Sequence, residues 1–463
     1  MVDRTSASPA RDTGAPDSPG WWPLAAIVAA VFMLMLDATV TTVAVAGIHA
    51  DLHAGIGDLQ WVMNGYTMAM AAFQLTAGSL ADRWGRRRSF LAGVALFTLA
   101  SLACGLAPNA GLLIAARVVQ GLAGALMFAT TLALIAQCYA GRRRGVAFGV
   151  RGMAAGLAVV LGPVVGGALV SGLGWRWIFL VNVPAGAVTL AVGASALPRR
   201  DPAHGPRGID LLGPPLLAVA LTLLVLGLLR GQEDGWSSGR ILGAFCGASI
   251  ALLLFTVVEH RRSDPMLDLS LFRDRVFSGT QVGSFTIQAS IFAMLIYVSL
   301  WFQDGLHYSA MKTGLCFLPL VVPILLAGPL AGAAMDRFPK GPLVSGALAV
   351  LGVAIMLMRG LTPDASWTDL VLGMLLAGLA CGVALPTLGG LAVDIPDQRH
   401  LGMASGVNNT VMQIGFSVGI AVYGAVVSRH HAFTDALNAL FTIGAAAALA
   451  GAAITVVTLR KSV

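Results

Sequence analysis

Long apolar runs separated by short polar loops cover most of this chain. A helix that crosses the hydrocarbon core of a bilayer needs about 20 residues, and apolar runs of that kind recur throughout the sequence. They predict fourteen membrane-spanning helices, near residues 22–48, 59–80, 89–107, 111–138, 145–172, 177–197, 211–229, 240–258, 277–302, 313–335, 341–358, 367–392, 402–427 and 436–459. The expected fold class is therefore an all-α polytopic membrane protein.

The positive charges indicate how these spans are oriented. With an even number of spans both termini lie on one side, where we count 21 Lys and Arg against six on the other, with Arg117 and Arg151 inside spans. Because Lys and Arg gather in cytoplasmic loops, we expect both termini in the cytoplasm and the chain in the inner (plasma) membrane. Arg151 is near the cytoplasmic end of its span, where its side chain can extend to the interface.

Composition supports a membrane protein and argues against other classes. Hydrophobic residues make up 57% of the chain and charged residues 11%, whereas roughly a quarter of the residues of an average soluble domain are charged. The net charge of +7 comes from scattered arginines, so we expect no nucleic-acid partner. The sequence shows no C-x-x-C pair and no nucleophile, metal or cofactor constellation, so we expect neither an enzyme nor a cofactor or metal site.

Asp37 is the one acidic residue, of the 22 in the chain, that falls in the middle of a predicted span. A carboxylate at the centre of a membrane helix costs about 2.5 to 3.5 kcal/mol on insertion scales and usually marks an ion pathway or a buried pair. A carboxyl group whose surroundings alternate between dry and wet can load and release a proton. We therefore expect Asp37 to couple transport to protons; the alternative is that it only pairs with an arginine to fix helix packing.

The expected partner of Asp37 is Arg117, in the stretch R-V-V-Q-G-L-A-G-A-L at Arg117–Leu126. Arg117, Gln120, Gly121 and Gly124 share one helical face, so the guanidinium and the carboxamide can point into the bundle beside a tightly packed surface. A cation there would lower the proton affinity of Asp37 when it is near and restore that affinity when it is distant.

The stretch G-S-L-A-D-R-W-G-R-R-R-S-F at Gly78–Phe90 lies between two apolar runs and predicts a short cytoplasmic hairpin. Gly78 allows two helices to approach closely, Asp82 can cap a helix end or pair with a cation, and Gly85 permits the turn. Four arginines hold the loop in the cytoplasm, namely Arg83, Arg86, Arg87 and Arg88. A generic basic loop is the plainer alternative, but the joint spacing of glycine, aspartate and arginine is more specific than charge alone.

A faint internal repeat divides the chain. G-A-A-M-D-R-F-P-K at Gly332–Lys340 echoes G-S-L-A-D-R-W-G-R at Gly78–Arg86 in its glycine, its Asp-Arg pair and its final cation. Many transporters are built from two such halves around a site at the membrane midplane. We therefore expect a disordered tail at 1–21, an N-terminal six-helix half at 22–197, a linker with two inserted spans at 198–275, a C-terminal six-helix half at 276–459 and a cytoplasmic end at 460–463.

Together these motifs resemble those of the major facilitator superfamily, in particular its fourteen-span drug:proton antiporter branch. The loop at Gly78–Phe90 is similar to the family signature after the second span, and L-D-A-T-V-T-T-V-A-V-A at Leu36–Ala46 is similar to the first-span motif. W-R-W-I-F-L-V-N-V-P at Trp175–Pro184 and the glycines of Gly402–Gly419 also fit. The resemblance implies that Asp37 is the proton-coupling carboxylate.

The fifth predicted span carries G-L-A-V-V-L-G-P-V-V-G-G at Gly156–Gly167. Proline bends a helix and glycines allow close contact, which by itself describes an ordinary kink. The residues Gly162, Pro163, Gly166 and Gly167 also resemble the signature of family members that run as antiporters, which implies export in exchange for protons.

The chain is thus predicted to export an amphiphilic drug- or antibiotic-like compound in exchange for protons, by alternating access and as a monomer. With no second acid within the membrane, a neutral, zwitterionic or singly charged substrate is expected. The candidate cavity residues are Tyr66, Gln120, Phe128, Tyr297, Asn409 and Gln413, which are aromatic or polar side chains inside predicted spans. Two alternatives stay open: a proton-coupled importer of a nutrient or metabolite, and a transport-inactive membrane sensor of the same fold.

Overall fold

The computed structural model describes residues 20–199, 212–262, 267, 269–334, 338–394, 401–430 and 432–460. Several predicted features lie outside these residues: most of the N-terminal tail, much of the 198–210 loop, the end of the chain after residue 460, and the Asp-Arg pair of the second repeat copy, Asp336 and Arg337. Every regular element in the described part of the chain is a helix.

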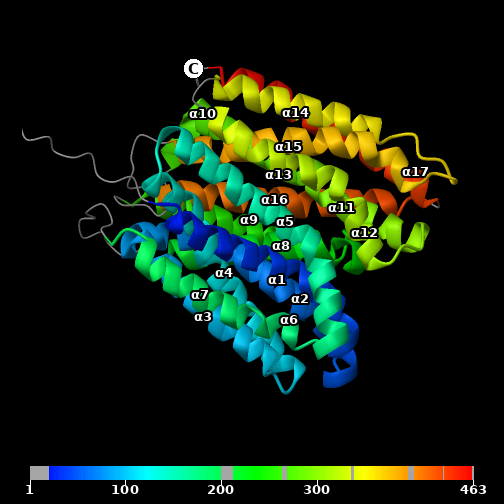
Figure 1. Cartoon of the computed structure of the whole chain (residues 1–463), viewed down its shortest axis with the longest axis horizontal. Coiled ribbons are helices and arrows are strands. Elements are labelled where there is room, and N and C mark those ends of the chain that lie inside the picture. The colour runs from blue at the N-terminus through cyan, green and yellow to red at the C-terminus, as the bar shows by residue number, and fades with distance from the viewer. Residues whose placement is uncertain are drawn as a thin grey trace, which may run out of the picture.

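The helices follow one another in the order of Figure 1, with two π-helical segments (η2, η3) and two 3-10 segments (η1, η4) between them. Their bounds are α1 Trp22–Leu52, α2 Ile56–Trp84, α3 Arg86–Gly105, α4 Ala110–Cys138, α5 Gly141–Leu173, α6 Trp177–Leu180, α7 Asn182–Ala196, α8 Gly213–Asp234, α9 Gly239–His260, η1 Leu269–Arg273, α10 Arg275–Ile287, η2 Gln288–Phe292, α11 Ala293–Leu300, η3 Trp301–Gly305, α12 Ala310–Cys316, α13 Leu318–Ala334, α14 Lys340–Leu357, η4 Trp367–Leu370, α15 Val371–Ala392, α16 Leu401–Val427 and α17 Phe433–Thr458.

Ten helical segments in the described part of the chain are long and apolar enough to cross a membrane. The helices at the other four predicted spans, α2, α5, α8 and α13, fall below that limit. Polar residues such as Asn64, Gln74 and Asp82 lower the hydropathy of α2. In α5, α8 and α13 the apolar stretches that the structure describes without interruption are shorter, namely Val164–Leu173, Pro215–Leu228 and Leu318–Ala331.

Two groups of helices lie side by side, as Figure 1 shows with α3 and α7 along one edge and α14 and α17 along the other. We call α1–α7 the N-terminal bundle and α10–α17 the C-terminal bundle. Within the first, α4 packs on α2 and α3, and α1 packs on α5; within the second, α15 packs on α13 and α14. The hairpin α8–α9 rests on both, because α8 contacts α2 and α16.

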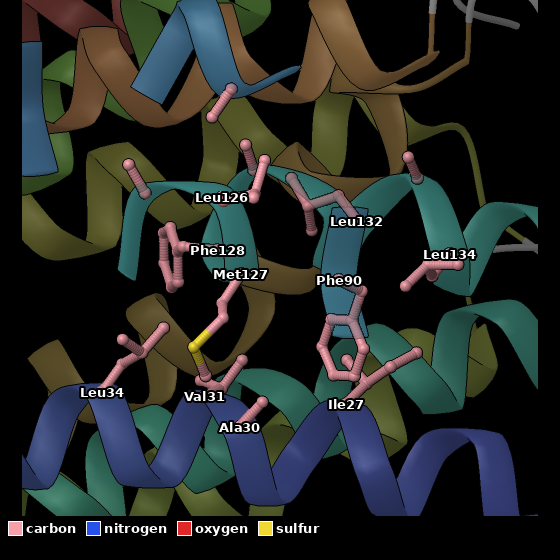
Figure 2. Packing of buried hydrophobic residues seen from close by; sticks show 14 of the residues in the cluster. Ile27, Ala30, Val31, Leu34, Phe90, Leu126, Met127, Phe128, Leu132 and Leu134 are labelled. Carbon is pink, nitrogen blue, oxygen red and sulfur yellow. The ribbon is translucent and has the colours of Figure 1, made fainter. Parts of the chain in front are cut away.

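The core is built from apolar side chains at helical spacing. Along α1, Ile27, Ala30, Val31 and Leu34 lie on one helical face and are fully buried. Figure 2 shows them on the side of α1 that faces Met127. In water such an apolar stripe is buried by the hydrophobic effect, whereas lipid tails are as apolar as these side chains and supply no such force. In lipid, the resulting close packing is what holds the helices together.

Helix ends follow local chemistry. Asn109 caps α4, because its side chain accepts a hydrogen bond of 2.9 Å from the amide of Leu112. The break between α2 and α3 is at Gly85, whose φ of 99° is a conformation that side-chain-bearing residues rarely adopt. These two points fix where α2, α3 and α4 turn, and therefore which of their faces meet.

Candidate functional site

The first candidate site is an ion pair in the middle of α1. Nη1 of Arg117, on α4, donates to Oδ2 of Asp37 at 2.5 Å, and both residues are 1% exposed. Asp37 is 15 residues from either end of α1, which at about 1.5 Å per residue is roughly 22 Å from each end. The structure therefore brings the predicted carboxylate and its predicted partner together far from both ends of the helix.

Two further donors hold the other oxygen of the carboxylate. Oδ1 of Asp37 accepts from Nε2 of Gln120 at 3.0 Å and from Nδ2 of Asn182 at 2.8 Å. Behind them, the hydroxyl of Ser101 accepts from Gln120 at 2.7 Å. Every group around Asp37 is a donor, which is the arrangement that an ionised carboxylate accepts.

Asn182 and Ser101 were not among the predicted site residues. Asn182 is part of the Trp175–Pro184 motif, and it begins α7 directly after the short helix α6. An asparagine within an apolar stretch was the available signal, but no local pattern indicates that α7 packs against α1. Ser101 carried no signal, since a serine inside an apolar helix most often bonds its own backbone.

Arg117 is enclosed by its own neighbours as well as by Asp37. Its Nε donates to the carbonyl of Val62 at 3.0 Å, and its Cζ is 4.4 Å from the centre of the Tyr66 ring and 5.6 Å from that of Phe179. Tyr66 in turn donates to the carbonyl of Leu34 at 3.3 Å. Aromatic faces attract a cation most strongly where water is excluded, so this cluster stabilises the buried guanidinium.

Small residues allow α1, α2, α4 and α5 to come together at this site. A Cβ on Gly121 would overlap the carbonyl oxygen of Tyr66, and one on Gly162 would overlap the Thr39 side chain of α1. Gly166 packs in the same way against Val40, whereas Gly167 has no atom within 4 Å of the position of a Cβ. Pro163 lies within α5, and its side chain is outside what the structure describes.

The second candidate site lies where the two bundles meet. Asp82, at the end of α2, is 2% exposed and accepts from the first backbone amides of α16, at 2.9 Å from Gly402 and 2.7 Å from Met403. It also pairs with Arg86, one turn further on, at 3.2 Å. Asp82 thus caps a helix of the other bundle, 320 residues away in the chain.

Gly78 makes this contact possible, because a Cβ there would overlap the carbonyl oxygen of Gly402. The other loop residues have separate places. Arg86 is 1% exposed beside Asp82, Arg87 donates to the carbonyl of Ala194 at 2.6 Å, and Arg83 is partly exposed. The expected basic loop therefore contains one arginine, Arg86, that is buried where the two bundles meet.

Further contacts extend the seam between the bundles. Ser405 donates to the carbonyl of Ala129 at 2.6 Å, and Nδ2 of Asn409 donates to the carbonyl of Phe128 at 3.4 Å. On the other side, a Cβ on Gly149 of α5 would overlap the backbone of Gly328 on α13. We use "the seam" below for these contacts together with those of Gly78 and Asp82.

The predicted cavity residues do not gather in one place. Tyr66 and Gln120 belong to the Asp37 cluster, while Phe128 and Asn409 meet at the seam. Tyr297 lies inside the C-terminal bundle, where it donates to the carbonyl of Ile420 at 2.8 Å. Gln413, one turn after Asn409 on α16, is partly exposed.

An open cleft of about 320 Å³ lies at the C-terminal end of α1 and is separate from both sites. Asp51 there pairs with Arg176 and accepts from the indole of Trp175 at 3.0 Å. Hydrogen bonds from Arg176 and Trp175 hold the pKa of Asp51 below its ordinary value. Within the described residues no group of three His, Cys, Asp or Glu side chains could hold a metal ion.

The sequence matches the family described as "Major Facilitator Superfamily" over residues 27–420 and 282–462. It is 34% identical over 409 residues to the "Tetracenomycin C resistance and export protein" of Streptomyces glaucescens, covering 88% of this chain and 76% of that protein. It is 33% identical over 401 residues to the "Multidrug resistance protein Stp" of Mycobacterium tuberculosis (strain CDC 1551 / Oshkosh), covering 86% and 74%.

The fold also resembles that of a solved transporter. The "human organic anion transporter MFSD10 (TETRAN)" superposes with a TM-score of 0.66 at 16% sequence identity, covering 95% of this chain and 100% of that one. At that identity the likeness concerns the fold alone. The family match, the length over which the two relatives align and the shared helical fold agree with one another. This chain therefore belongs to the major facilitator superfamily, whose members are multi-pass membrane transporters and not enzymes.

Proposed function

We propose that this protein exports amphiphilic drug- or antibiotic-like compounds across the inner membrane in exchange for protons. The observation that carries the proposal is the buried pair of Asp37 and Arg117, with Gln120 and Asn182 on the second carboxylate oxygen. Burying an ionisable pair within a membrane is costly, and such pairs usually mark a functional site. The relatives named as resistance, export and multidrug resistance proteins support export as its direction.

In the proposed cycle Asp37 binds a proton, and Arg117 controls how readily it does so. While the guanidinium holds Oδ2, the carboxylate already has its counter-charge, so a proton must compete with Arg117. Protonation would remove that attraction, while Arg117 would keep its hydrogen bond to Val62 and its contact with the Tyr66 ring. Each protonation state would thus favour a different packing of α1 against α4.

The proposed membrane topology has fourteen spans with both termini in the cytoplasm. Each of α2, α5, α8 and α13 packs along a helix that is long enough to cross a membrane, namely α4, α1, α9 and α15, which supports counting them as spans. The 21 positive residues expected on the side of the termini support the orientation. The seam at Asp82 would then face the cytoplasm.

Alternating access would rock the N-terminal half, 22–197, against the C-terminal half, 276–459, with 198–275 as the linker carrying the inserted pair α8–α9. The seam at Asp82 would hold the transporter closed toward the cytoplasm. Close packing of Gly162 and Gly166 on α1 would limit proton leakage along α5. We propose that the protein works as a monomer, since all the contacts that the proposed cycle uses lie within one chain.

The test measures proton release from inverted membrane vesicles. The vesicle interior is acidified, a pH-sensitive dye is followed, and a panel of amphiphiles is added to the wild type, to Asp37→Asn and to Asp58→Asn. Asp58 is an exposed cap at the start of α2, so its variant is the matched control. We expect compound-dependent proton release in the wild type and in Asp58→Asn, and a loss of about 100-fold or more in Asp37→Asn, as for a group in direct contact with the transferred proton.

Three outcomes would contradict the proposal. Release that persists in Asp37→Asn would place the proton site elsewhere. Substrate and proton moving in the same direction would indicate an importer. Vesicles that release no protons with any compound, although the protein is folded, would favour a membrane sensor of the same fold.

A further inference from the structure

Arg151 is the second arginine inside a span, and its environment differs from that of Arg117. It stands ten residues after the start of α5, roughly 15 Å along the helix at about 1.5 Å per residue. Its side chain does not extend along the helix to the interface, which corrects the sequence-based expectation. The guanidinium turns toward α4 instead, where its Nε donates to the hydroxyl of Thr131 at 2.9 Å.

The guanidinium of Arg151 is held in place on two sides. Its Cζ is 4.6 Å from the centre of the Phe128 ring, and Thr131, which is 0% exposed, is itself fixed by donating to the carbonyl of Phe128 at 2.7 Å. A hydroxyl acceptor and an aromatic face orient a guanidinium without neutralising its charge. The bond to Thr131 uses Nε, so Nη1 and Nη2 take no part in it.

Among the described residues, no carboxylate pairs with Arg151, and its Nη2 is buried without a hydrogen-bond partner. Arg151 as a whole is partly exposed, but a buried donor on a cation is costly unless a partner compensates its desolvation. Arg117 shows what such compensation looks like, with the Asp37 carboxylate at 2.5 Å. The described residues supply nothing equivalent to Arg151.

Arg151 is next to the seam, because Phe128 connects them. The Phe128 ring lies under the guanidinium, while the Phe128 carbonyl accepts from Asn409 of the C-terminal bundle. The Oδ1 atom of Asn409 is also buried without a partner in the described part of the chain. Next to Arg151, Gly152 has no atom within 4 Å of the position of a Cβ. The unpaired cation is thus located where the two bundles would separate, with open space beside it.

We infer that Arg151 binds the carboxylate of an anionic amphiphile, so that the exported compounds include aromatic carboxylic acids. The edge with Nη1 and Nη2 matches the two oxygens of a carboxylate, and the neighbouring Phe128 ring suits an aromatic body. This inference rests on the proposed function and refines it, by naming a singly charged anion as the substrate class and a residue other than Asp37 as its contact.

The test compares acids with their neutral esters in direct binding. Purified full-length protein in nanodiscs is titrated with anthracene-9-carboxylate and anthraquinone-2-carboxylate, and with the methyl ester of each. The variants are Arg151→Gln, which removes the charge, Arg151→Lys, which keeps it, and Arg142→Gln. Arg142 is exposed at the start of α5, so its variant controls for a change in overall charge.

We expect the wild type and Arg142→Gln to bind the acids more tightly than the esters. In Arg151→Gln the acids should lose about tenfold or more in affinity while the esters are unchanged, as expected when one charge-assisted pair is lost. Arg151→Lys should keep part of the preference, since a lysine retains the charge but not the forked geometry. Because Arg151→Lys retains the charge, it keeps the test decisive if Arg151→Gln does not fold.

Other outcomes would overturn the inference. Arg151 would not bind a carboxylate if the wild type bound acids and esters equally or bound neither acid. The same conclusion would follow if Arg151→Gln lost equal affinity for acids and esters. The same anionic chemistry occurs in lipid headgroups, so the titration is repeated with and without phosphatidylglycerol. If that lipid stabilises the protein only when Arg151 is present, and acids are not preferred over esters, Arg151 binds a lipid headgroup instead of a substrate.

Binding also separates this inference from the proposed function. A preference for acids that depends on Arg151, in a protein that releases no protons in the vesicle assay, would support the anion site and contradict proton-coupled export. Proton release driven by neutral compounds, with no preference for acids, would do the opposite.

Discussion

Asp37 and Asp82 are both buried carboxylates beside an arginine, yet their partners come from different parts of the molecule. All the side chains that hold Asp37 belong to the N-terminal bundle, on α4 and α7. Asp82 shares its charge between Arg86 of the same bundle and the first amides of α16 in the other.

This difference indicates which of the two sites a movement between the bundles would change. A movement that separates the bundles must part Asp82 from Gly402 and Met403, whereas the partners of Asp37 lie within one bundle. We therefore propose that the first carboxylate binds the proton and that the second controls the conformational equilibrium. The following predictions test this proposal and are ordered by the size of the expected effect.

Gly78→Val should have the largest effect on the seam. Even a Cβ at residue 78 would overlap the carbonyl oxygen of Gly402, and backbone on both sides leaves no flexible group to yield. Vesicle transport should fall to the background of empty vesicles, and the distance between spin labels at the exposed positions Trp84 and Phe338 should lengthen relative to the wild type. The control is Gly346→Ala on α14, where nothing lies within 4 Å of the new Cβ. Wild-type transport by Gly78→Val would mean that this closure is not part of the cycle.

Asp82→Asn should weaken the same closure without a steric clash. The change removes the charge that caps α16 and leaves Arg86 buried without its carboxylate, which costs about 3 kcal/mol. The measurement is the distance between the same two spin labels, which should lengthen in part of the molecules. Asp394→Asn is the control, because Asp394 pairs with Lys340 at the surface, where ion pairs contribute little. An unchanged label distance and unchanged transport would remove Asp82 from the conformational equilibrium.

Asn182→Ala should affect the Asp37 site alone. It removes the donor at 2.8 Å from Oδ1 of Asp37 and leaves Gln120 as the remaining donor to that oxygen. The free energy of unfolding should fall by about 1 to 3 kcal/mol, the cost of an unmade hydrogen bond to a buried charged group. Thermal unfolding in detergent measures the change, with Asn64→Ala, partly buried on α2, as the control. A shift in the spin-label distance would show instead that the two carboxylate sites are coupled at rest.

Asp51→Asn should have the smallest effect and a distinct dependence on pH. Hydrogen bonds from Arg176 and Trp175 lower the pKa of Asp51 in the folded protein, so its contribution to stability is present above the unfolded pKa. That contribution is lost as the pH falls through the lowered folded pKa. The melting temperatures of Asp51→Asn and the wild type should therefore differ slightly near neutral pH and converge in acid. Asp304→Asn, also exposed, is the control for removing one surface charge. A difference between Asp51→Asn and the wild type that grows in acid would contradict the lowered pKa of Asp51.

Much of the helical layout could be predicted from the sequence, because a bilayer requires apolar segments of a set length. Each predicted span coincides with a helix or with consecutive helices, although only ten segments of the described chain meet the length and hydropathy limit. The pairing of Asp37 with Arg117 could also be predicted, since two opposite charges in a membrane interior have few other partners.

The remaining site residues could not be predicted, for reasons of geometry. Asn182 reaches Asp37 only because α7 packs against α1, and no local pattern encodes that contact. The predicted cavity residues were chosen by type, and residue type does not say which face of a helix meets the other bundle. Tyr66 consequently lies under Arg117, and Tyr297 lies within the C-terminal bundle.

Hydropathy and charge act locally along the chain, so the sequence alone sets the class of protein, the approximate ends of its helices and the one carboxylate in the middle of a span. What each polar side chain meets depends on the tertiary structure. It directs Asp82 to the amides of α16, surrounds Asp37 with donors and leaves Arg151 without a counter-charge among the described residues. Those outcomes depend on contacts between residues far apart in sequence, where the packing of whole helices selects which side chains can touch.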